Sequence, residues 1–318
     1  MSALTTDSVL RLGTRGSVLA QTQSRAVAGE LERLHSGLQV ELKILKTSGD
    51  VIRDRPLHEF GGKGLFTKEI EQALLAGEID LAVHSFKDVP VTMPLVEQAD
   101  LIIAAAPKRE DPRDALISTL ASTIEALPSG AKVGTGSLRR RCQILALRPD
   151  LKLEPIRGNI DTRIRKLKDG QFDAVILAMA GLRRATLFDA ELMYAIETSQ
   201  MLPASGQGAL ALQCRRDDAR TRALLRAMDD ATARACVTAE RELVRLLEGD
   251  CQSPIAALAE VAEGRMTMRA AVGSRGGEPP VVWAQAEGSA DDPAAVAAKV
   301  HRELILAGAQ KLLHGQNP

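Results

Sequence analysis

The sequence is poor in aromatic residues, and its charges cancel. Aromatic side chains make up 2% of the 318 residues, with one Trp and one Tyr, so a stacking platform for single-stranded nucleic acid is not expected. The 41 basic and 41 acidic residues give no net charge, which also argues against a nucleic-acid binder. Any role of charge must therefore come from where individual charged residues are placed.

Long apolar runs and cysteine motifs are missing as well. No stretch reaches the roughly 18 consecutive apolar residues of a membrane-spanning helix, and residues 1–14 lack the basic and apolar regions of a secretion signal. Cys142, Cys214, Cys236 and Cys251 are far apart and form no C-x-x-C pair, so neither a zinc site nor a disulfide framework is indicated. We expect a cytoplasmic protein that uses no metal and binds neither membrane nor nucleic acid.

The sequence contains an order of elements that occurs twice. Strand-like runs lie at 9–13, 40–45, 80–83, 132–133, 151–155 and 172–179. Helical patterns between them lie at 18–34, 66–76, from 138 onward and at 161–168. Gly13-Thr-Arg-Gly-Ser17 and Gly134-Thr-Gly-Ser137 follow the first strand of each half and look like counterparts. We therefore predict two similar α/β lobes facing each other across a cleft.

The last part of the chain has a different pattern. Another strand ends at Cys214, and two helical patterns follow at 218–228 and 232–247. Three strand-like runs come next, and a final helix opens at Asp292-Pro293, with Pro in its first turn, and extends to Leu313. The three runs lie near 258–261, 266–272 and 281–286. This order predicts a small α+β domain from about residue 221 to the end.

Polar and charged side chains follow the strand at 80–83, before Pro90 ends the run. In open α/β sheets, ligands bind at the carboxyl ends of strands, so His84, Ser85, Lys87 and Asp88 are placed to meet a ligand. A carboxylate beside a Lys suits a cationic intermediate and a proton transfer, which makes Asp88 the candidate catalytic residue. A surface turn with a Lys–Asp pair fits the same residues. We expect His84 to orient the strand end rather than to transfer a proton.

Arginines gather near the two Gly-Thr loops and after strands of the second half. Small residues between a strand and a helix let backbone N–H groups approach an anion, and the guanidinium fork matches a carboxylate. The residues concerned are Arg15, Arg139, Arg140, Arg141, Arg157, Arg163, Arg183 and Arg184. They predict a ligand with several carboxylates, although solvated helix faces would also account for roughly half of them.

Cys251 differs from the other cysteines because it lies in a polar loop, between Asp250 and Gln252. The neighbouring Asp250 disfavours the thiolate, so a stable covalent attachment point fits better than a fast nucleophile. A buried, inert cysteine is the alternative. The polar, Gly-rich segment at 47–64 is predicted to be a mobile lid, with Lys63 and Phe66 near its hinge.

Taken in order, the motifs resemble the porphobilinogen deaminase family, also called hydroxymethylbilane synthases. They are Gly61-Gly-Lys-Gly-Leu-Phe-Thr-Lys68, Val83-His-Ser-Phe-Lys-Asp-Val-Pro90, Gly136-Ser-Leu-Arg-Arg140, Arg157-Gly-Asn159, Leu202-Pro-Ala-Ser-Gly-Gln-Gly208 and the block from Glu240 to Cys251. The resemblance implies two lobes like those of type II periplasmic binding proteins plus the small C-terminal α+β domain. Lobe 1 would comprise 1–104 and 204–220, lobe 2 would comprise 105–203, and the cofactor-attachment domain would comprise 221–318.

The resemblance also implies an activity. Members of the family are transferases of tetrapyrrole, porphyrin and heme biosynthesis that act as cytoplasmic monomers. They condense four porphobilinogen molecules head to tail on a covalent dipyrromethane cofactor, release ammonia at each step, and hydrolyse the product to linear hydroxymethylbilane. The cysteine matching Cys251 would hold one dipyrromethane per chain.

Roles for individual residues follow from motif position. Ser85, Lys87, Asp88, Thr135, Ser137, Arg139 and Arg140 would bind the cofactor, and Arg15, Ser17, Gln23, Arg157, Arg163 and Arg184 would bind the incoming or growing pyrroles. Asp88 would stabilise positive charge on the pyrrole nitrogen as the amine leaves. Three residues depart from the family pattern: Gly136 replaces a Ser, Asp250 replaces a small residue and Ser253 replaces a β-branched one. A non-enzymatic anion-binding protein on the same scaffold is the main rival interpretation.

Overall fold

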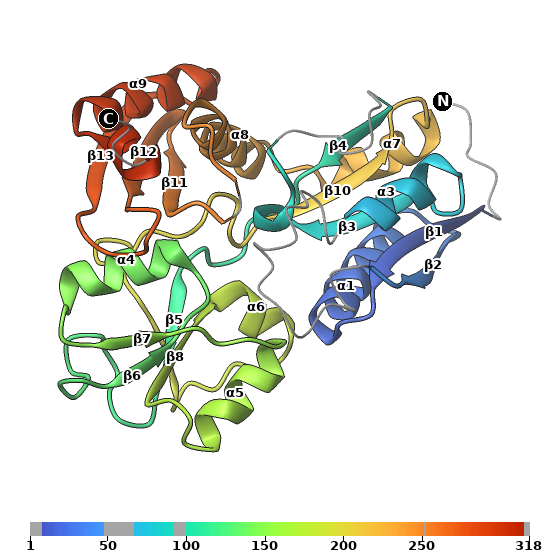
Figure 1. Cartoon of the computed structure of the whole chain (residues 1–318). Helices are drawn as coiled ribbons and strands as arrows, with labels where there is room; N and C mark the ends of the chain where they lie inside the picture. Colours follow the sequence, from blue (N-terminus) through green and yellow to red (C-terminus); the bar gives the residue numbers. More distant parts are fainter. Residues whose placement is uncertain (1–7, 48–66, 92–99, 251, 315–318) are drawn as a thin grey trace. The chain divides into compact units, whose positions relative to one another are not determined.

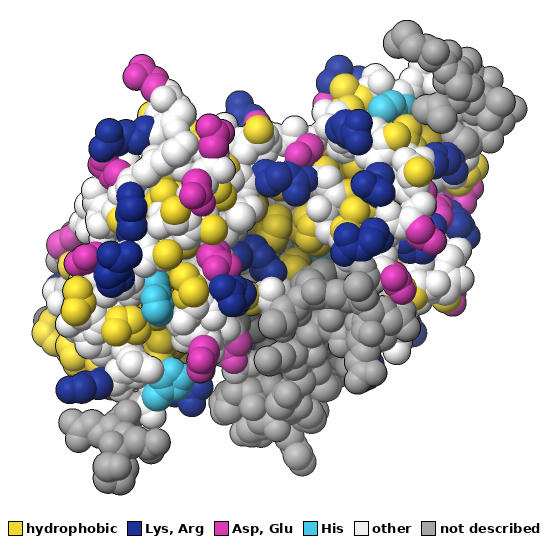
Figure 2. Space-filling model, turned by 90° about the horizontal axis from the view of Figure 1, so that it is seen from above, with side chains coloured by type: hydrophobic (Ala, Val, Ile, Leu, Met, Phe, Trp, Pro, Cys, Tyr) yellow, Lys and Arg dark blue, Asp and Glu magenta, His cyan; other side chains and the backbone are white. Residues whose placement is uncertain are grey.

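The structure is a computed structural model that describes residues 8–47, 67–91, 100–250 and 252–314 (Figure 1). It divides into two compact units. Unit 1 contains residues 1–109 and 209–234, and unit 2 contains residues 110–208 and 235–318. On the face shown in Figure 2, basic and acidic side chains are interspersed. Among the described residues, no helix has the length and apolar character needed to cross a membrane.

Unit 1 is built on a five-stranded sheet of order β2-β1-β3-β10-β4. Its strands are β1 (Ser8–Arg15), β2 (Leu38–Leu45), β3 (Leu81–Ser85), β4 (Leu101–Ala105) and β10 (Leu210–Arg215). β1 is parallel to β2 and β3, whereas β10 runs antiparallel between β3 and β4. A strand that follows residue 204 thus pairs with two strands from the first half of the chain.

Three helices contact strands of this sheet: α1 (Val18–Leu34), α3 (Lys68–Leu75) and α7 (Ala219–Leu225). α1 begins at Ser17, whose Oγ accepts a hydrogen bond from the Ala20 N–H at 3.3 Å. Its buried residues Val27 and Leu31 join a core with Leu10 and Leu12 of β1. Fully burying a Leu side chain contributes about 1.5–3 kcal/mol, so this core anchors the loop between β1 and α1.

Unit 2 contains a second five-stranded sheet, of order β7-β6-β8-β5-β9. Its strands are β5 (Asp114–Ile117), β6 (Lys132–Gly134), β7 (Lys152–Glu154), β8 (Ala174–Ala178) and β9 (Met193–Ala195). Its helices are α4 (Leu138–Leu147), α5 (Ile160–Lys168) and α6 (Met179–Arg184). β6 is parallel to β7 and β8, and β5 is antiparallel to β8 and β9.

The two sheets have the same pattern of neighbours and directions. β1 and β6 occupy equivalent positions, as do β3 and β8, and an antiparallel strand follows in each sheet. The segment Gly13–Ser17 contains the end of β1 and leads into α1, and the segment Gly134–Ser137 begins at the last residue of β6 and leads into α4. The predictions of two similar α/β lobes and of equivalent Gly-Thr loops are confirmed.

The rest of unit 2 is a three-stranded antiparallel sheet of order β11-β12-β13 with helices. These elements are α8 (Ala231–Leu246), whose residues up to Arg234 belong to unit 1, and β11 (Ile255–Ala262), β12 (Arg265–Val272), β13 (Val282–Ser289), α9 (Pro293–Leu306) and α10 (Ala309–His314). Figure 1 shows α9 along one face of this sheet. The small C-terminal α+β part is thus as predicted, and it shares a compact unit with the second α/β lobe.

Several element boundaries differ from the sequence predictions. The strand expected at 80–83 extends to Ser85 and is followed by a single 3₁₀ turn, Phe86–Asp88. The final helix is divided into α9 and α10, because Gly308 adopts a φ of +93° between them. Strands β4, β5 and β9 were not predicted.

Candidate functional site

The 3₁₀ turn after β3 determines the position of Asp88. The side chain of Phe86 is buried, and its backbone N–H donates to the Ala209 carbonyl at 3.0 Å. The Val89 N–H donates back to the Phe86 carbonyl at 3.1 Å and closes the turn. Lys87 is partly buried and Asp88 is exposed. The turn therefore fixes the backbone on both sides while the Asp88 carboxylate stays accessible to a ligand.

His84 is turned into the protein rather than toward solvent. It is 7% exposed, and its Nε2 lies 2.9 Å from Oε1 of Gln213 on β10. Gln213 in turn donates from Nε2 to Oε1 of the buried Glu71 at 3.0 Å. Burial, together with the positive charge of Arg15, lowers the pKa of His84 to about 4 although the Gln213 contact opposes the shift. His84 is thus neutral near pH 7 and ties β3 to β10, which agrees with the expected orienting role.

Three further predicted residues of unit 1 lie at the end of β1 and in the first part of α1. Arg15 ends β1, and Ser17 caps α1. Gln23 is buried on α1 and its Nε2 lies 3.3 Å from the Ser85 Oγ. The structure therefore brings Gln23 and Ser85 together and shows that Ser17 has a structural task as a helix cap.

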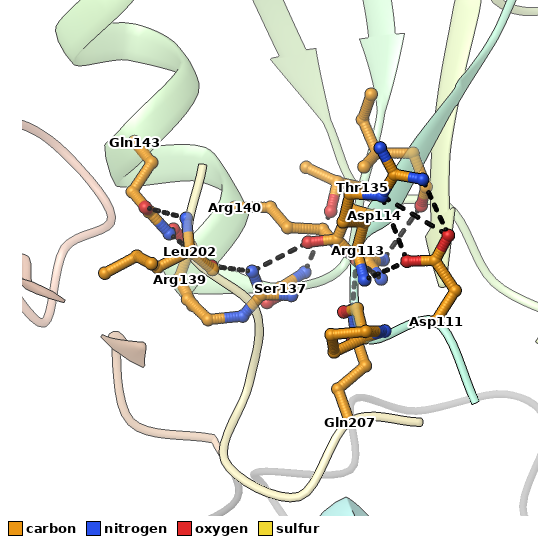
Figure 3. A network of polar contacts seen from close by, with 12 residues as sticks. Asp111, Arg113, Asp114, Thr135, Ser137, Arg139, Arg140, Gln143, Leu202 and Gln207 are labelled. Atoms are coloured by element: carbon orange, nitrogen blue, oxygen red, sulfur yellow. Dashed lines mark hydrogen bonds and ion pairs between the residues drawn. The ribbon is translucent and has the colours of Figure 1, made fainter. Parts of the chain in front are cut away.

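In unit 2, a buried carboxylate lies between two of the predicted arginines (Figure 3). Asp114 begins β5 and is fully buried, and its Oδ2 accepts from Nη1 of Arg139 at 2.8 Å. Its Oδ1 accepts from Nη2 of Arg140 at 2.7 Å and from Nε2 of Gln207 at 2.9 Å. Burial opposes ionisation of Asp114, but the two guanidinium groups outweigh it and hold the pKa of this carboxyl well below its ordinary value.

Arg139 and Arg140 are also hydrogen-bonded to the backbone. Nη1 of Arg139 donates to the Leu202 carbonyl at 2.6 Å, and Nη1 of Arg140 donates to the Ile176 carbonyl at 2.8 Å. Within the part of the chain that the structure describes, Nε and Nη2 of Arg139 make no hydrogen bond. The two guanidinium groups are held rigidly, and Arg139 keeps donors for a further acceptor.

Arg157 and Arg163 form a second group of positive charge near Arg140. The Nε of Arg163 donates to the Gly158 carbonyl at 2.8 Å. Partial burial and, to a smaller degree, the positive charges of Arg140 and Arg157 together lower the pKa of Arg163 to about 10. Three cations in such proximity favour an anion, because a bound carboxylate would relieve their mutual repulsion.

Arg184 is held in the same unit by the Gly208 carbonyl, which accepts from its Nη2 at 2.7 Å. Burial lowers the pKa of Arg184, and Glu110 opposes that shift. Thr135 and Ser137 lie in the loop before α4, where the Thr135 Oγ1 accepts from the Ser137 N–H at 3.2 Å. This contact shapes the loop that precedes Arg139 and Arg140.

Three predicted residues, Cys251, Lys63 and Phe66, lie outside the described residues. Two important residues were missed. Asp114 begins an apolar run and could have been noticed as a carboxylate at the start of a strand, but its partners lie 25 to 93 positions away along the chain. Gln207 was noticed only as part of a Gly-rich motif.

Family models match most of the chain. The model described as "Porphobilinogen deaminase, dipyromethane cofactor binding domain" matches residues 10–223. The model described as "Porphobilinogen deaminase, C-terminal domain" matches residues 234–305.

Similar proteins and structures were also found. The porphobilinogen deaminase of Roseiflexus sp. (strain RS-1) is 46% identical over 306 residues, which cover 96% of this chain and 99% of the relative. That of Syntrophobacter fumaroxidans is 47% identical over 308 residues, which cover 97% and 98%. Among solved structures, a periplasmic substrate-binding protein of an ABC transporter from Coxiella burnetii aligns with a TM-score of 0.44 and 17% identity, covering 69% of this chain and 91% of that one. The methionine-binding protein MetQ aligns with a TM-score of 0.43 and 15% identity, covering 68% and 88%. On the family models and the two relatives, this chain belongs to the porphobilinogen deaminase family.

Proposed function

We propose that the chain joins four porphobilinogen molecules head to tail, releases ammonia at each step and hydrolyses off linear hydroxymethylbilane. The family match makes it a transferase of tetrapyrrole biosynthesis with a dipyrromethane cofactor-binding domain. The structural observation that supports the proposal best is the group of arginines in unit 2 around Asp114 and Arg163. Each pyrrole of substrate and product carries an acetate and a propionate, which such guanidinium groups match.

The residues present fit dipyrromethane. Its carboxylates need several rigid cationic donors, and Arg163 has a lowered pKa because it is partly buried and because Arg140 and Arg157 carry like charges near it. When bound, dipyrromethane supplies the free α-carbon to which the first porphobilinogen is joined. Lys87, Arg139 and Arg140 would hold its carboxylates, with hydroxyl contacts from Ser85, Thr135 and Ser137. Cys251 would be the attachment point.

The remaining predicted residues would act on the substrate. The Arg15, Arg157, Arg163 and Arg184 side chains would bind the carboxylates of incoming and growing pyrroles. The Ser17 hydroxyl keeps a hydrogen to donate while it caps α1, whereas Gln23 would act mainly by orienting Ser85.

The Asp88 carboxylate would act at the substrate's pyrrole nitrogen. As the protonated amine leaves, positive charge develops on the ring, and an exposed carboxylate next to it would stabilise that charge. Asp88 would also assist the transfer of the proton that leaves the attacking carbon. The turn at Phe86–Asp88 supports this role because it holds the backbone while leaving the carboxylate accessible.

The proposal also includes the domain division, the compartment, the oligomeric state and the lid residues of the chain. Two lobes and a separate attachment domain agree with the two family models, which meet between residues 223 and 234. A reducing, cytoplasmic compartment agrees with the free and buried Cys142, Cys214 and Cys236. We also propose a monomer, which light scattering on the purified protein tests. Lys63 and Phe66 would belong to a lid.

The activity is tested by incubating the purified chain with porphobilinogen. We expect ammonia and hydroxymethylbilane in a ratio of four to one. An acidic aldehyde reagent that colours dipyrromethane should also stain the protein before substrate is added. A protein that binds porphobilinogen but neither stains nor releases ammonia would be the non-enzymatic anion-binding protein instead.

A further inference from the structure

The segment 202–208 of unit 2 connects the C-terminal sheet with the arginines. Leu202 packs in a buried cluster with Ala256 and Leu258 of β11. The Ala257 N–H donates to the Pro203 carbonyl at 3.0 Å. Since β11 is an edge strand of its sheet, this segment covers backbone groups that would otherwise lack partners on that side.

Glu240 of α8 joins the same segment to β11. Its carboxylate is fully buried, with Oε2 accepting from the Gly206 N–H at 2.6 Å and Oε1 accepting from the Ala259 N–H at 2.9 Å. Hydrogen bonds to an ionised acceptor are stronger than neutral ones. One carboxylate thus bridges two backbone groups that are 53 positions apart, and it does so from the helix that leads toward Cys251.

The two residues after Gly206 make hydrogen bonds to Asp114 and Arg184. Gln207 donates from Nε2 to Asp114 at 2.9 Å and to the Pro112 carbonyl at 2.7 Å. The Gly208 carbonyl accepts from Arg184 at 2.7 Å and from the Glu110 N–H at 3.1 Å. Gly208 has a φ of +86°, and an added Cβ would lie 2.3 Å from the Glu110 carbonyl oxygen. The Gly208 backbone therefore lies close against that of Glu110, and a shift at the adjoining Gly206 is expected to displace the groups that bond Asp114 and Arg184.

We propose that Glu240 is a positioning residue for the binding of substrate carboxylates. Its hydrogen bond to Gly206 fixes the backbone of segment 204–208, and this segment in turn holds Asp114 and Arg184 in place. The inference rests on the proposed function. It gives the C-terminal part of the chain a second task beside cofactor attachment. Glu240 links the helix before Cys251 to Arg184, which would bind the growing chain, and to Asp114, which holds the cofactor-binding Arg139 and Arg140.

The first test compares Glu240→Gln with Glu242→Gln. Both lie on α8 and lose the same charge, but Glu242 pairs with Arg245 of its own helix. In Glu240→Gln, an amide NH₂ replaces one acceptor oxygen and meets a backbone N–H. We expect intact mass to show normal dipyrromethane loading, and kcat/KM for porphobilinogen to fall about tenfold or more, mainly through KM. Glu242→Gln should match the wild type.

A second test asks whether Glu240 acts through the segment 204–208. Gln207→Leu removes the contact with Asp114, and the double variant with Glu240→Gln completes a cycle. If both changes disturb the same guanidinium groups, their losses in kcat/KM are not additive. Additive losses would overturn the proposal, as would a lowered unfolding midpoint with unchanged KM.

Two controls keep the result interpretable. If Glu240→Gln does not fold, Glu240→Asp keeps the charge but is one methylene shorter, and it should still raise KM; an unchanged KM in that variant would overturn the proposal. A wild-type protein without dipyrromethane and without product would refute the proposed function itself. An active wild type beside a Glu240→Gln variant that matches Glu242→Gln would refute only the positioning role.

Discussion

The Asp114→Asn substitution tests the arrangement of the buried arginines. Asn keeps the size of the side chain but removes the negative charge, and its single oxygen can serve only one of the two guanidinium groups. Arg139 and Arg140 have 5% and 7% exposed side chains beside a fully buried Asp114. The variant therefore leaves buried positive charge without a partner.

The expected cost follows from that geometry. Hydrogen bonds to charged groups contribute about 1.5–3 kcal/mol each, and breaking a buried ion pair by removing one partner costs about 3–5 kcal/mol. Because one hydrogen bond is lost and both guanidinium groups lose the carboxylate that compensates their charge, we expect the free energy of unfolding to fall by about 3–5 kcal/mol. Glu197→Gln is the control, since it breaks an exposed pair with Arg113 in the same unit and should change stability little.

Urea unfolding followed by fluorescence measures this loss. Trp283 is the only tryptophan of the chain and lies in unit 2 with Asp114, so its emission reports on the unit that the substitution affects. A loss below about 1 kcal/mol, the range of a surface ion pair, would refute the reasoning. It would mean that Arg139 and Arg140 do not depend on Asp114.

The same carboxyl predicts a pH dependence with a definite sign. Its folded pKa is below the ordinary value of 3.8, so the folded state binds the proton less readily than the unfolded state. The stabilisation is complete above pH 3.8 and is lost as the pH falls further. We expect this acid-induced loss to be smaller in Asp114→Asn than in the wild type.

Three other substitutions test the site. Asp88→Asn should nearly abolish hydroxymethylbilane formation without changing the unfolding midpoint, because the side chain is exposed; near-normal turnover would remove Asp88 from the mechanism. Arg157→Ala should accumulate partly elongated enzyme species in mass spectra, whereas Lys168→Ala on the exposed side of α5 should not; unchanged elongation would make Arg157 a structural residue. His84 stays neutral in the folded state down to about pH 4, so stability should decline between pH 6.5 and 4, and His84→Gln should remove that part of the decline. An imidazole resonance of His84 that titrates near pH 6.5 would contradict this.

The order of strands and helices could be predicted where periodicity was strong. The apolar run before His84 and the Gly-Thr loops after β1 and β6 were recognised from local sequence alone, and the structure confirms both. The exact end of β3 was not recognised, because both faces of this strand are buried and its residues show no alternation. The sequence therefore placed His84 after the strand, whereas it lies within β3.

The partners of the arginines could not be predicted. Asp114, Arg140 and Gln207 come from three separate segments, and their contacts exist only after the sheet of unit 2 has formed. Glu240 was noticed only as the start of the motif block that ends at Cys251, and its contacts could not be predicted because the backbone groups of Gly206 and Ala259 lie outside its helix. Local sequence patterns predict which charged residues lie near a strand end or loop. The partners of these residues depend on contacts between segments that are far apart in the sequence.

The most direct test of the central claim is the intact mass of the purified protein beside a Cys251→Ser variant. We predict that the wild type carries an added mass equal to one dipyrromethane and that the variant does not. That result would establish Cys251 as the attachment point and support the proposed reaction. A wild type of unmodified mass, purified from cells that make porphobilinogen, would contradict the account.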